Sequence, residues 1–193
     1  GNAAGFSNAT SMTSTYTPSA TDYTNGSVKI YLTSTGNGAC PAVLDSLLLS
    51  FQAGPTVNAG GPVTRCSNSP VVSNLGGSFT VATGVQWTGG TAANFTPNTT
   101  TATAQYTPTP AEIAAGSVTL TLTTTGNGIC PAAVDTKTIT FTPAPSLTMG
   151  PNVSVCANNS VANITATATN AASVLWTGGG AGSTFGNATS ANT

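Results

Sequence analysis

The chain has 193 residues, of which only 4% are charged, and it contains no histidine. An average soluble domain carries about 25% charged residues. Hydrophobic residues make up 39% of the chain, which is enough for a core and argues against disorder driven by low hydrophobicity and high net charge. Three cations and a formal net charge of −1 cannot supply the basic surface that nucleic-acid binding requires.

The same composition leaves few groups for enzyme chemistry. Without histidine, four scattered carboxylates offer almost no candidate for general acid–base catalysis. Asp45 and Asp135 each stand alone, whereas calcium sites usually cluster carboxylates. The cysteines form no C-x-x-C pair for zinc, and Lys29 and Lys137 are expected to project from strands rather than into clefts. We expect no enzyme, no cofactor, no metal site, no nucleic-acid partner and, because no apolar run is long enough, no membrane insertion.

The sequence repeats itself with a period of about 90 residues. Residues 35–42 recur as residues 125–132, with both glycines and the cysteine in place. Trp87-Thr88-Gly89-Gly90 returns as Trp176-Thr177-Gly178-Gly179, one residue short of the same offset. Self-similarity at a fixed period is the signature of an array of structural units.

This period matches the size of a small β-sandwich domain. The Pro-containing stretches Ala53-Gly54-Pro55 and 142–145 look like linkers between units. We therefore expect tandem Ig-like β-sandwich domains of about 90 residues, cut from a longer array. Residues 1–54 would be the C-terminal part of one repeat, residues 55–145 a complete repeat, and residues 146–193 the N-terminal part of the next.

Alternation of apolar and polar side chains predicts the strands. Val118, Leu120 and Leu122 alternate with threonines, as Ile139 and Phe141 do, which is the period of a half-buried strand. Threonine suits the solvent-facing side because it is β-branched. Further strands are expected over residues 28–32, 48–51, 79–81, 85–87 and 101–106. The fold class predicted from this pattern is all-β.

Two short segments instead predict single helical turns. Thr109, Pro110 and Glu112 supply an N-cap, a proline at the first helical position and an acid at the third, and Gly116 supplies a stop. Residues 19–26 repeat the device with Asp22 as the acid. Both acids are therefore predicted to have a structural role.

The succession from Cys66 through Trp87-Thr88-Gly89-Gly90 and Tyr106-Thr107-Pro108 to residues 116–122 and 126–131 resembles the tandem Ig-like or PKD-like repeats of giant Bacteroidetes cell-surface adhesins. Among these are gliding-motility-associated adhesins exported by the type IX system. The resemblance covers essentially the whole chain. It implies an extracellular, cell-surface location and a role as stalk, adhesin or filament, in which each repeat contacts its neighbours in the chain.

In that setting disulfides are expected, and three pairings stay open. The default is one bridge inside the complete domain, Cys66–Cys130, although an Ig-type strand order would place these two residues at opposite ends. A hairpin across each linker would instead join Cys40 to Cys66 and Cys130 to Cys156. In a ladder, each early cysteine would bond the late cysteine of the next domain.

The aromatic residues have two interpretations. Trp87 and Trp176 could stack on sugars, but a tryptophan on the third strand of a sandwich is more often a core residue. Tyr16 and Tyr106 are likewise predicted to be packed at corners. In addition, Asp45-Ser46-Leu47 resembles the Bacteroidetes O-glycosylation acceptor motif, which makes Ser46 a candidate modification site.

The function that these features favour is mechanical: a stalk or spacer region of a large bacterial cell-surface adhesin or extracellular filament. One alternative is a self-assembling filament subunit that pairs its strand edges with other copies of itself. Another is a carbohydrate-binding accessory module of a secreted enzyme, with surface glycans as ligands.

Overall fold

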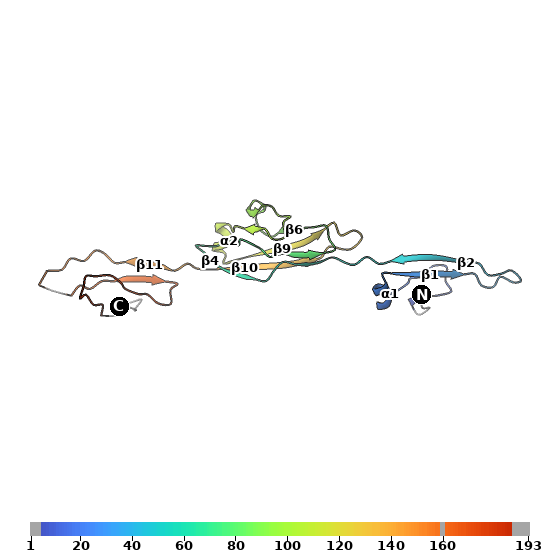
Figure 1. The fold of residues 1–193 in the computed structure, drawn as a ribbon, viewed down its shortest axis with the longest axis horizontal. Coiled ribbons are helices and arrows are strands. Elements are labelled where there is room, and N and C mark those ends of the chain that lie inside the picture. The colour runs from blue at the N-terminus through green and yellow to red at the C-terminus, as the bar shows by residue number, and fades with distance from the viewer. Residues whose placement is uncertain (1–4, 159–160, 187–193) are drawn as a thin grey trace.

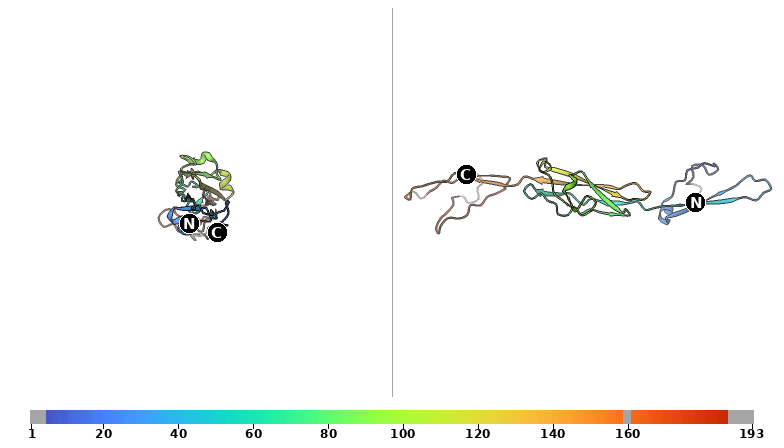
Figure 2. Two further views of the ribbon diagram at one scale, coloured as in Figure 1. Left: turned by 90° about the vertical axis from the view of Figure 1, so that its right-hand side faces the viewer. Right: turned by 90° about the horizontal axis from the view of Figure 1, so that it is seen from above.

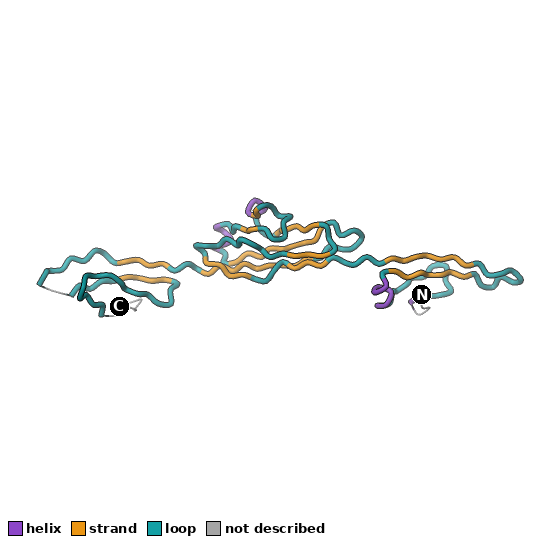
Figure 3. Tube along the Cα trace, viewed as in Figure 1, coloured by secondary structure: helices purple, strands orange, loops and turns teal. Residues whose placement is uncertain are grey.

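The computed structural model describes residues 5–158 and 161–186. Figures 1 and 2 show three units in a row along one axis, joined by extended linkers at residues 51–55 and 143–145. We call them the N-terminal unit (residues 5–50), the central unit (56–142) and the C-terminal unit (146–186). Regular structure is mostly strand (Figure 3), so the all-β class is confirmed.

The central unit is built on a four-stranded sheet with the order β4-β10-β9-β6. The two long middle strands are antiparallel, β6 pairs with β9 antiparallel, and β4 pairs with β10 in parallel. The bounds of these strands are β4 Val63–Cys66, β6 Gly84–Thr88, β9 Ser117–Thr125 and β10 Val134–Thr142.

Two short antiparallel pairs complete the central unit. In one, β3 (Thr56–Asn58) pairs with β5 (Ser78–Thr80). In the other, β7 (Phe95–Thr96) follows the 3₁₀ helix η2 (Ala92–Asn94) and pairs with β8 (Gln105–Tyr106). These pairs and the loops around them cover one face of the four-stranded sheet, and the hydrophobic core lies between.

The core follows the predicted alternation. On β9 and β10 the inward side chains of Leu120, Leu122 and Ile139 are fully buried, while the threonines between them face outward. Burial of one such side chain stabilises a fold by about 1.5–3 kcal/mol. Val85 and Trp87 on β6 extend the same face. The side chains that pack against it from the covering segments include Val72, Leu75, Phe95, Ala104 and Tyr106.

Both predicted helical turns are present with complete capping boxes. Helix α2 (Pro110–Ala114) begins after Thr109, whose hydroxyl accepts the Glu112 N–H, while the Glu112 carboxylate accepts the Thr109 N–H at 2.7 Å. Helix α1 (Ala20–Asn25) is capped in the same way by residues 19 and 22. Each turn feeds the chain into a long strand.

The N-terminal unit repeats the middle of the central sheet. Its strands β1 (Ser27–Thr33) and β2 (Leu44–Ser50) form an antiparallel pair in which Val28 opposes Leu49. One period later, β9 and β10 place Val118 opposite Ile139. The two hairpins therefore share one register.

The C-terminal unit repeats the start of the central unit. Strand β11 (Ser146–Met149) pairs with β12 (Ala166–Thr169), as β3 pairs with β5. A hydroxyl–hydroxyl hydrogen bond joins Ser146 to Thr169 at 2.7 Å, and its counterpart joins Thr56 to Thr80 at 2.6 Å. The C-terminal unit therefore resembles the first part of a repeat and the N-terminal unit the last part.

Two expectations were wrong in detail. The strand expected over residues 101–106 is confined to Gln105–Tyr106, because the Asn98 side chain accepts hydrogen bonds from Thr100 and Thr101 and holds this stretch in a turn. Lys137 does not project from its strand into solvent. It shares the inward face of β10 with Ile139 and is only 6% exposed.

The recurring Trp-Thr-Gly-Gly motif has a packing reason at its two glycines. Gly89 has φ of +91°, a conformation that L side chains rarely adopt. A Cβ atom at Gly90 would collide with the hydroxyl of Tyr106 and approach Leu120 Cδ2 to 2.9 Å. The backbone of this turn therefore lies directly on the core.

We predict that Gly90→Ala lowers the free energy of unfolding of the central unit by about 1–3 kcal/mol, because the added methyl overpacks the core. Urea unfolding followed by Trp87 fluorescence in a Trp176→Phe background would measure it. Gly61→Ala is the matched control, since a Cβ there meets nothing within 4 Å. Equal effects of the two substitutions would contradict the prediction.

Candidate functional site

The candidate site is the pair of sheet edges that the N-terminal unit leaves open. In the central unit, β4 flanks β10 and β6 flanks β9. Among the described residues, no strand flanks the equivalent hairpin of β1 and β2. Unpaired edge N–H and C=O groups are ready to pair with another strand.

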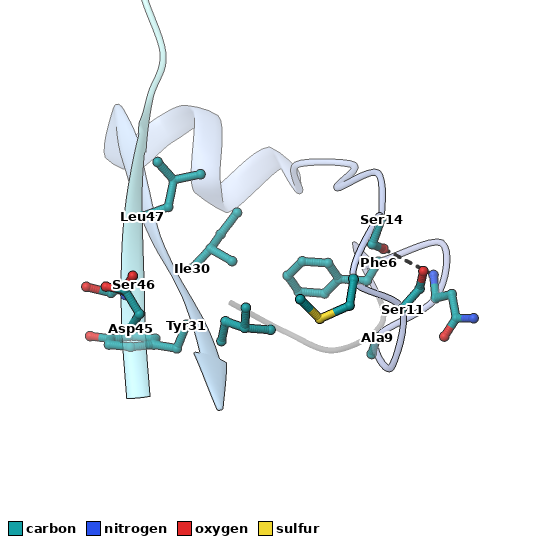
Figure 4. Close-up of a pocket in the computed structure, with 12 residues that line it drawn as sticks. Phe6, Ala9, Ser11, Ser14, Ile30, Tyr31, Asp45, Ser46 and Leu47 are labelled. Atoms are coloured by element: carbon teal, nitrogen blue, oxygen red, sulfur yellow. Dashed lines mark hydrogen bonds between the residues drawn. The ribbon is translucent and has the colours of Figure 1, made fainter. Parts of the chain in front are cut away.

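The inner face of this hairpin is open as well. Leu32 is 57% exposed and Leu47 63% exposed, whereas Leu122, one period after Leu32, is fully buried. A groove of about 640 Å³ separates the hairpin from residues 6–14, and we call it the N-terminal groove. In Figure 4 the side chains of Ile30 and Leu47 point across it towards Phe6.

The central unit shows what fills the equivalent space. Trp87 is 1% exposed, stacks on Phe95 at a centroid distance of 6.4 Å, and donates its indole N–H to the carbonyls of Thr101 and Ala102 at 3.2 Å each. Trp87 therefore lies in the core and presents no face to a sugar. The indole N–H is the one polar group of this side chain, and it is hydrogen-bonded, so the burial of Trp87 leaves no polar atom unsatisfied.

The C-terminal unit carries the corresponding tryptophan without the sheet. Trp176 stacks on Phe185 at the same centroid distance of 6.4 Å. Val174 and Trp176 are half-buried, while Leu175 between them is 70% exposed. In the described part of this unit only two short strands are paired, so its apolar side chains lack a sheet to pack on.

Each of the two tyrosines is hydrogen-bonded to the acid of a helical turn, as expected for packed corner residues. Tyr106 is fully buried and donates its hydroxyl to Glu112 at 2.7 Å, and half-buried Tyr16 donates to Asp22 at 2.8 Å. Burial first, and then the hydrogen bond to Glu112, raise the pKa of Tyr106 above its ordinary value. The acids that cap the turns therefore also hold the tyrosines, which is a structural role.

A polar clamp on the inner face of β10 holds residues 59–61. Asp135 accepts the Ala59 N–H at 2.8 Å, and Lys137 donates to the Gly61 carbonyl. The Ala59 N–H, followed by the Thr136 N–H, lowers the pKa of Asp135, and burial lowers the pKa of Lys137. In the N-terminal unit, Asp45 accepts the N–H of the residue that follows it, Ser46, and no clamp like that of Asp135 is formed among the described residues. The sequence analysis missed this clamp. Its signal was the alternation of β10, which places residues 135 and 137 on the same inward face as Ile139 and Phe141.

The structure does not bring Cys66 and Cys130 together, and all four cysteines are free thiols in it. Cys66 is in register with Thr142 at the C-terminal end of β10, and Cys130 lies in the loop before that strand. A nine-residue strand at about 3.3 Å per residue separates them by roughly 25 Å. A disulfide needs Cα atoms within about 7 Å.

The hairpin pairing does not meet this requirement either. Cys40 lies in the loop between β1 and β2, so the whole of β2 and the linker stand between it and the central unit. Cys66 lies beyond that, at the far end of β4. The same strand lengths separate Cys130 from Cys156. The disulfide pairing itself stays a prediction.

Both central cysteines do lie against linkers. Cys130 Sγ contacts the carbonyl oxygens of Gln52 at 3.8 Å and Ala53 at 3.7 Å. Cys66 adjoins Thr142, one period after Gln52, and the next residue, Ser67, bonds through its N–H to the Thr142 carbonyl at 2.9 Å. The early cysteine of one repeat and the late cysteine of the next would thus meet at one linker, which is the placement that the ladder needs.

Ser46 lies on exposed β2 with its N–H bonded to Asp45, and its glycosylation stays a prediction. Within residues 5–158 and 161–186, no three His, Cys, Asp or Glu residues gather as a metal site would require. No helix in these segments is long and apolar enough to cross a membrane. Comparison of the chain with protein-family models, with curated proteins and with solved structures found no match.

We predict that Asp135→Asn destabilises the central unit at neutral pH, because the amide keeps an acceptor but loses the charge that strengthens the bond to Ala59. The pKa of Asp135 is lower in the folded chain than in the unfolded chain, where it is roughly 4, so the ionised carboxylate stabilises the fold at pH values above the unfolded pKa. This contribution is lost as the pH falls through the folded-state pKa. The difference in unfolding free energy between wild type and variant should therefore shrink in acid.

Urea unfolding at a series of pH values would measure this difference. Asp45→Asn is the control, since the Asp45 carboxylate accepts the N–H of its neighbour Ser46 within the N-terminal unit. A difference between wild type and Asp135→Asn that stayed constant into strong acid would contradict an electrostatic origin.

Proposed function

We propose that this chain is a load-bearing section of an extracellular, cell-surface spacer built from tandem Ig-like repeats. The central unit acts as one module and the outer units as parts of adjoining modules. Support comes from three observations: the repeat of about 90 residues, the linear order of the units, and the short linkers at their junctions.

The parallel pairing of β4 with β10 carries this proposal. The chain enters the central unit just before β3 and leaves it at the end of β10. Tension between the two linkers therefore pulls β4 and β10 in opposite directions along their length. Four residue pairs, from Val63 with Ile139 to Cys66 with Thr142, share this load at once.

Loading in shear resists force better than peeling, because all bonds of the ladder must break together rather than one after another. The surface of the unit suits the same role. Its outward strand positions carry threonine rather than charge, and extended linkers keep the modules apart.

We predict a direction-dependent unfolding force for the central unit. Single-molecule pulling on the 193-residue chain through attachment points at residues 54 and 143 should require a higher force than pulling at residues 116 and 143. The second geometry peels β9 from β10 starting at their open end, where Ser117 opposes Thr140.

In the first geometry, unfolding should occur in one step that releases about 30 nm of chain, at roughly 3.5 Å per residue. Equal forces in the two directions, or a gradual extension with no step, would contradict a load-bearing role. The second geometry serves as an internal control for the stability of the unit, because both attachments unfold the same core.

A further inference from the structure

The second linker, residues 143–145, is held from both sides. Its prolines at 143 and 145 have no N–H group, so Ala144 carries the single backbone N–H of this linker. That N–H donates to the Ser67 hydroxyl of the central unit at 2.8 Å. The Ala144 carbonyl accepts the side-chain amide of Asn170, in the C-terminal unit, at 3.0 Å. One residue of the linker therefore bonds to both of the units that the linker joins.

These two bonds continue the strand pairing on either side of the linker. Before the linker, the pairing of β4 with β10 ends at Thr142, and the Ser67 N–H bonds to the Thr142 carbonyl at 2.9 Å. After the linker, β11 pairs with β12, which ends at Thr169, immediately before Asn170. The prolines hold the residues that precede them in extended conformations. Contacts therefore run from β10 through Ala144 into β11, and the linker is no free tether.

The backbone turns in the same way at Asn170 and at its counterpart, Val81. Both residues follow the strand that pairs with the first strand after a linker. Asn170 has φ of +55° and Val81 has φ of +66°, which is the left-handed region. Asparagine tolerates this region because its short polar side chain can bond locally, whereas a β-branched residue there is a genuine outlier.

Val81 occupies this position without the bond that Asn170 makes. The Ala82 N–H bonds back to the Thr80 carbonyl at 2.8 Å, which closes a three-residue turn of the rare, strained class. The Val81 side chain is 48% exposed and has no polar group. It can therefore donate nothing to the carbonyl of Gly54, the counterpart of Ala144 in the first linker.

The composition of the two linkers differs in the same direction. The first has Gly54 where the second has Ala144, and only one proline follows it. Glycine has the widest choice of backbone conformations of any residue. The first linker does contact the central unit through Cys130, but a thiol is a weak donor and it faces Gln52 and Ala53 rather than Gly54.

We propose that the residue at position 81 or 170 sets the stiffness of the joint that precedes it. Asparagine locks the linker to the unit that follows, and valine leaves the linker free to bend at Gly54. One residue per repeat would then encode where the array is rigid and where it bends. This inference goes beyond the spacer function, because a spacer requires only length.

The size of the effect follows from the exposure of the lock. Asn170 is exposed, so its bond to Ala144 competes with bonds to water. Loss of one such hydrogen bond shifts the equilibrium between locked and open joints by roughly fivefold. A shift of this size changes the spread of distances across the joint, while the strands on either side stay paired.

Distances between spin labels placed across each linker would measure the joints. In the 193-residue chain with its four cysteines replaced by serine, labels at positions 140 and 148 span the second linker, and labels at positions 48 and 64 span the first. All four positions are exposed, and serine keeps a donor at position 130. The expected result is a narrow distance distribution across the second linker and a broader one across the first.

Asn170→Asp removes the lock with the smallest change of shape. The carboxylate has no donor and would face the Ala144 carbonyl oxygen, so the distribution across the second linker should broaden. Asn170→Gly should broaden it without adding charge. Asn163→Asp, at an exposed asparagine of the same unit, is the matched control and should leave the distribution narrow. Labels at positions 148 and 167, which oppose each other on β11 and β12, would show that this strand pair stays intact.

Val81→Asn tests the reverse change, because it supplies the first linker with a donor. It should narrow the distribution across that linker. Val81→Gly is the matched control: it relieves the left-handed backbone without adding a donor, so it should stabilise the central unit and leave the distribution broad.

Two outcomes would overturn the proposal. One is an equal width for Asn170→Asp and Asn163→Asp across the second linker. The other is a Val81→Gly variant that narrows the first joint as much as Val81→Asn does. Pulling between residues 54 and 143 loads the central unit alone, so failure here leaves the load-bearing role to be judged on its own.

Discussion

A two-stranded hairpin with one apolar face cannot bury that face alone, and the whole molecule is arranged around this constraint. In the central unit, β9 and β10 place Leu120, Leu122 and Ile139 on one side, β6 adds Trp87 beside Leu122, and the chain returns over this face with Tyr106. The same hairpin in the N-terminal unit lacks this cover among the described residues, and its leucines are exposed. One hairpin register therefore gives a closed core in one unit and an open groove in the other.

Four of the few charged residues have structural roles in this fold. The capping acids Asp22 and Glu112 each serve a helical turn and a tyrosine hydroxyl at once. Asp135 and Lys137 instead bind backbone groups of residues 59–61 from inside the sheet. Charged groups near the core hold the backbone in place, and the outward strand positions of β9 and β10 are left mainly to threonine.

Much of the central unit could be predicted from its sequence. Alternation located β9 and β10, the capping boxes located both helical turns, and the repeat located equivalent residues. The stretch 101–104 could not be predicted as a turn, because the Asn98 side chain competes with strand pairing through local hydrogen bonds that alternation does not reveal. Lys137 was expected in solvent because lysine is charged, but its place in the alternation of β10 puts it on the inward face.

The cysteines show most clearly what the repeat in the sequence reveals and what requires the tertiary structure. The repeat alone shows which cysteines are equivalent, since equivalence needs only the period, but it left three pairings open. Tertiary structure decided distance: the strands of the sheet hold Cys66 and Cys130 at opposite ends, and the linker brings Cys130 against Gln52. Periodicity records which positions repeat, whereas only strand direction and strand length determine which positions meet.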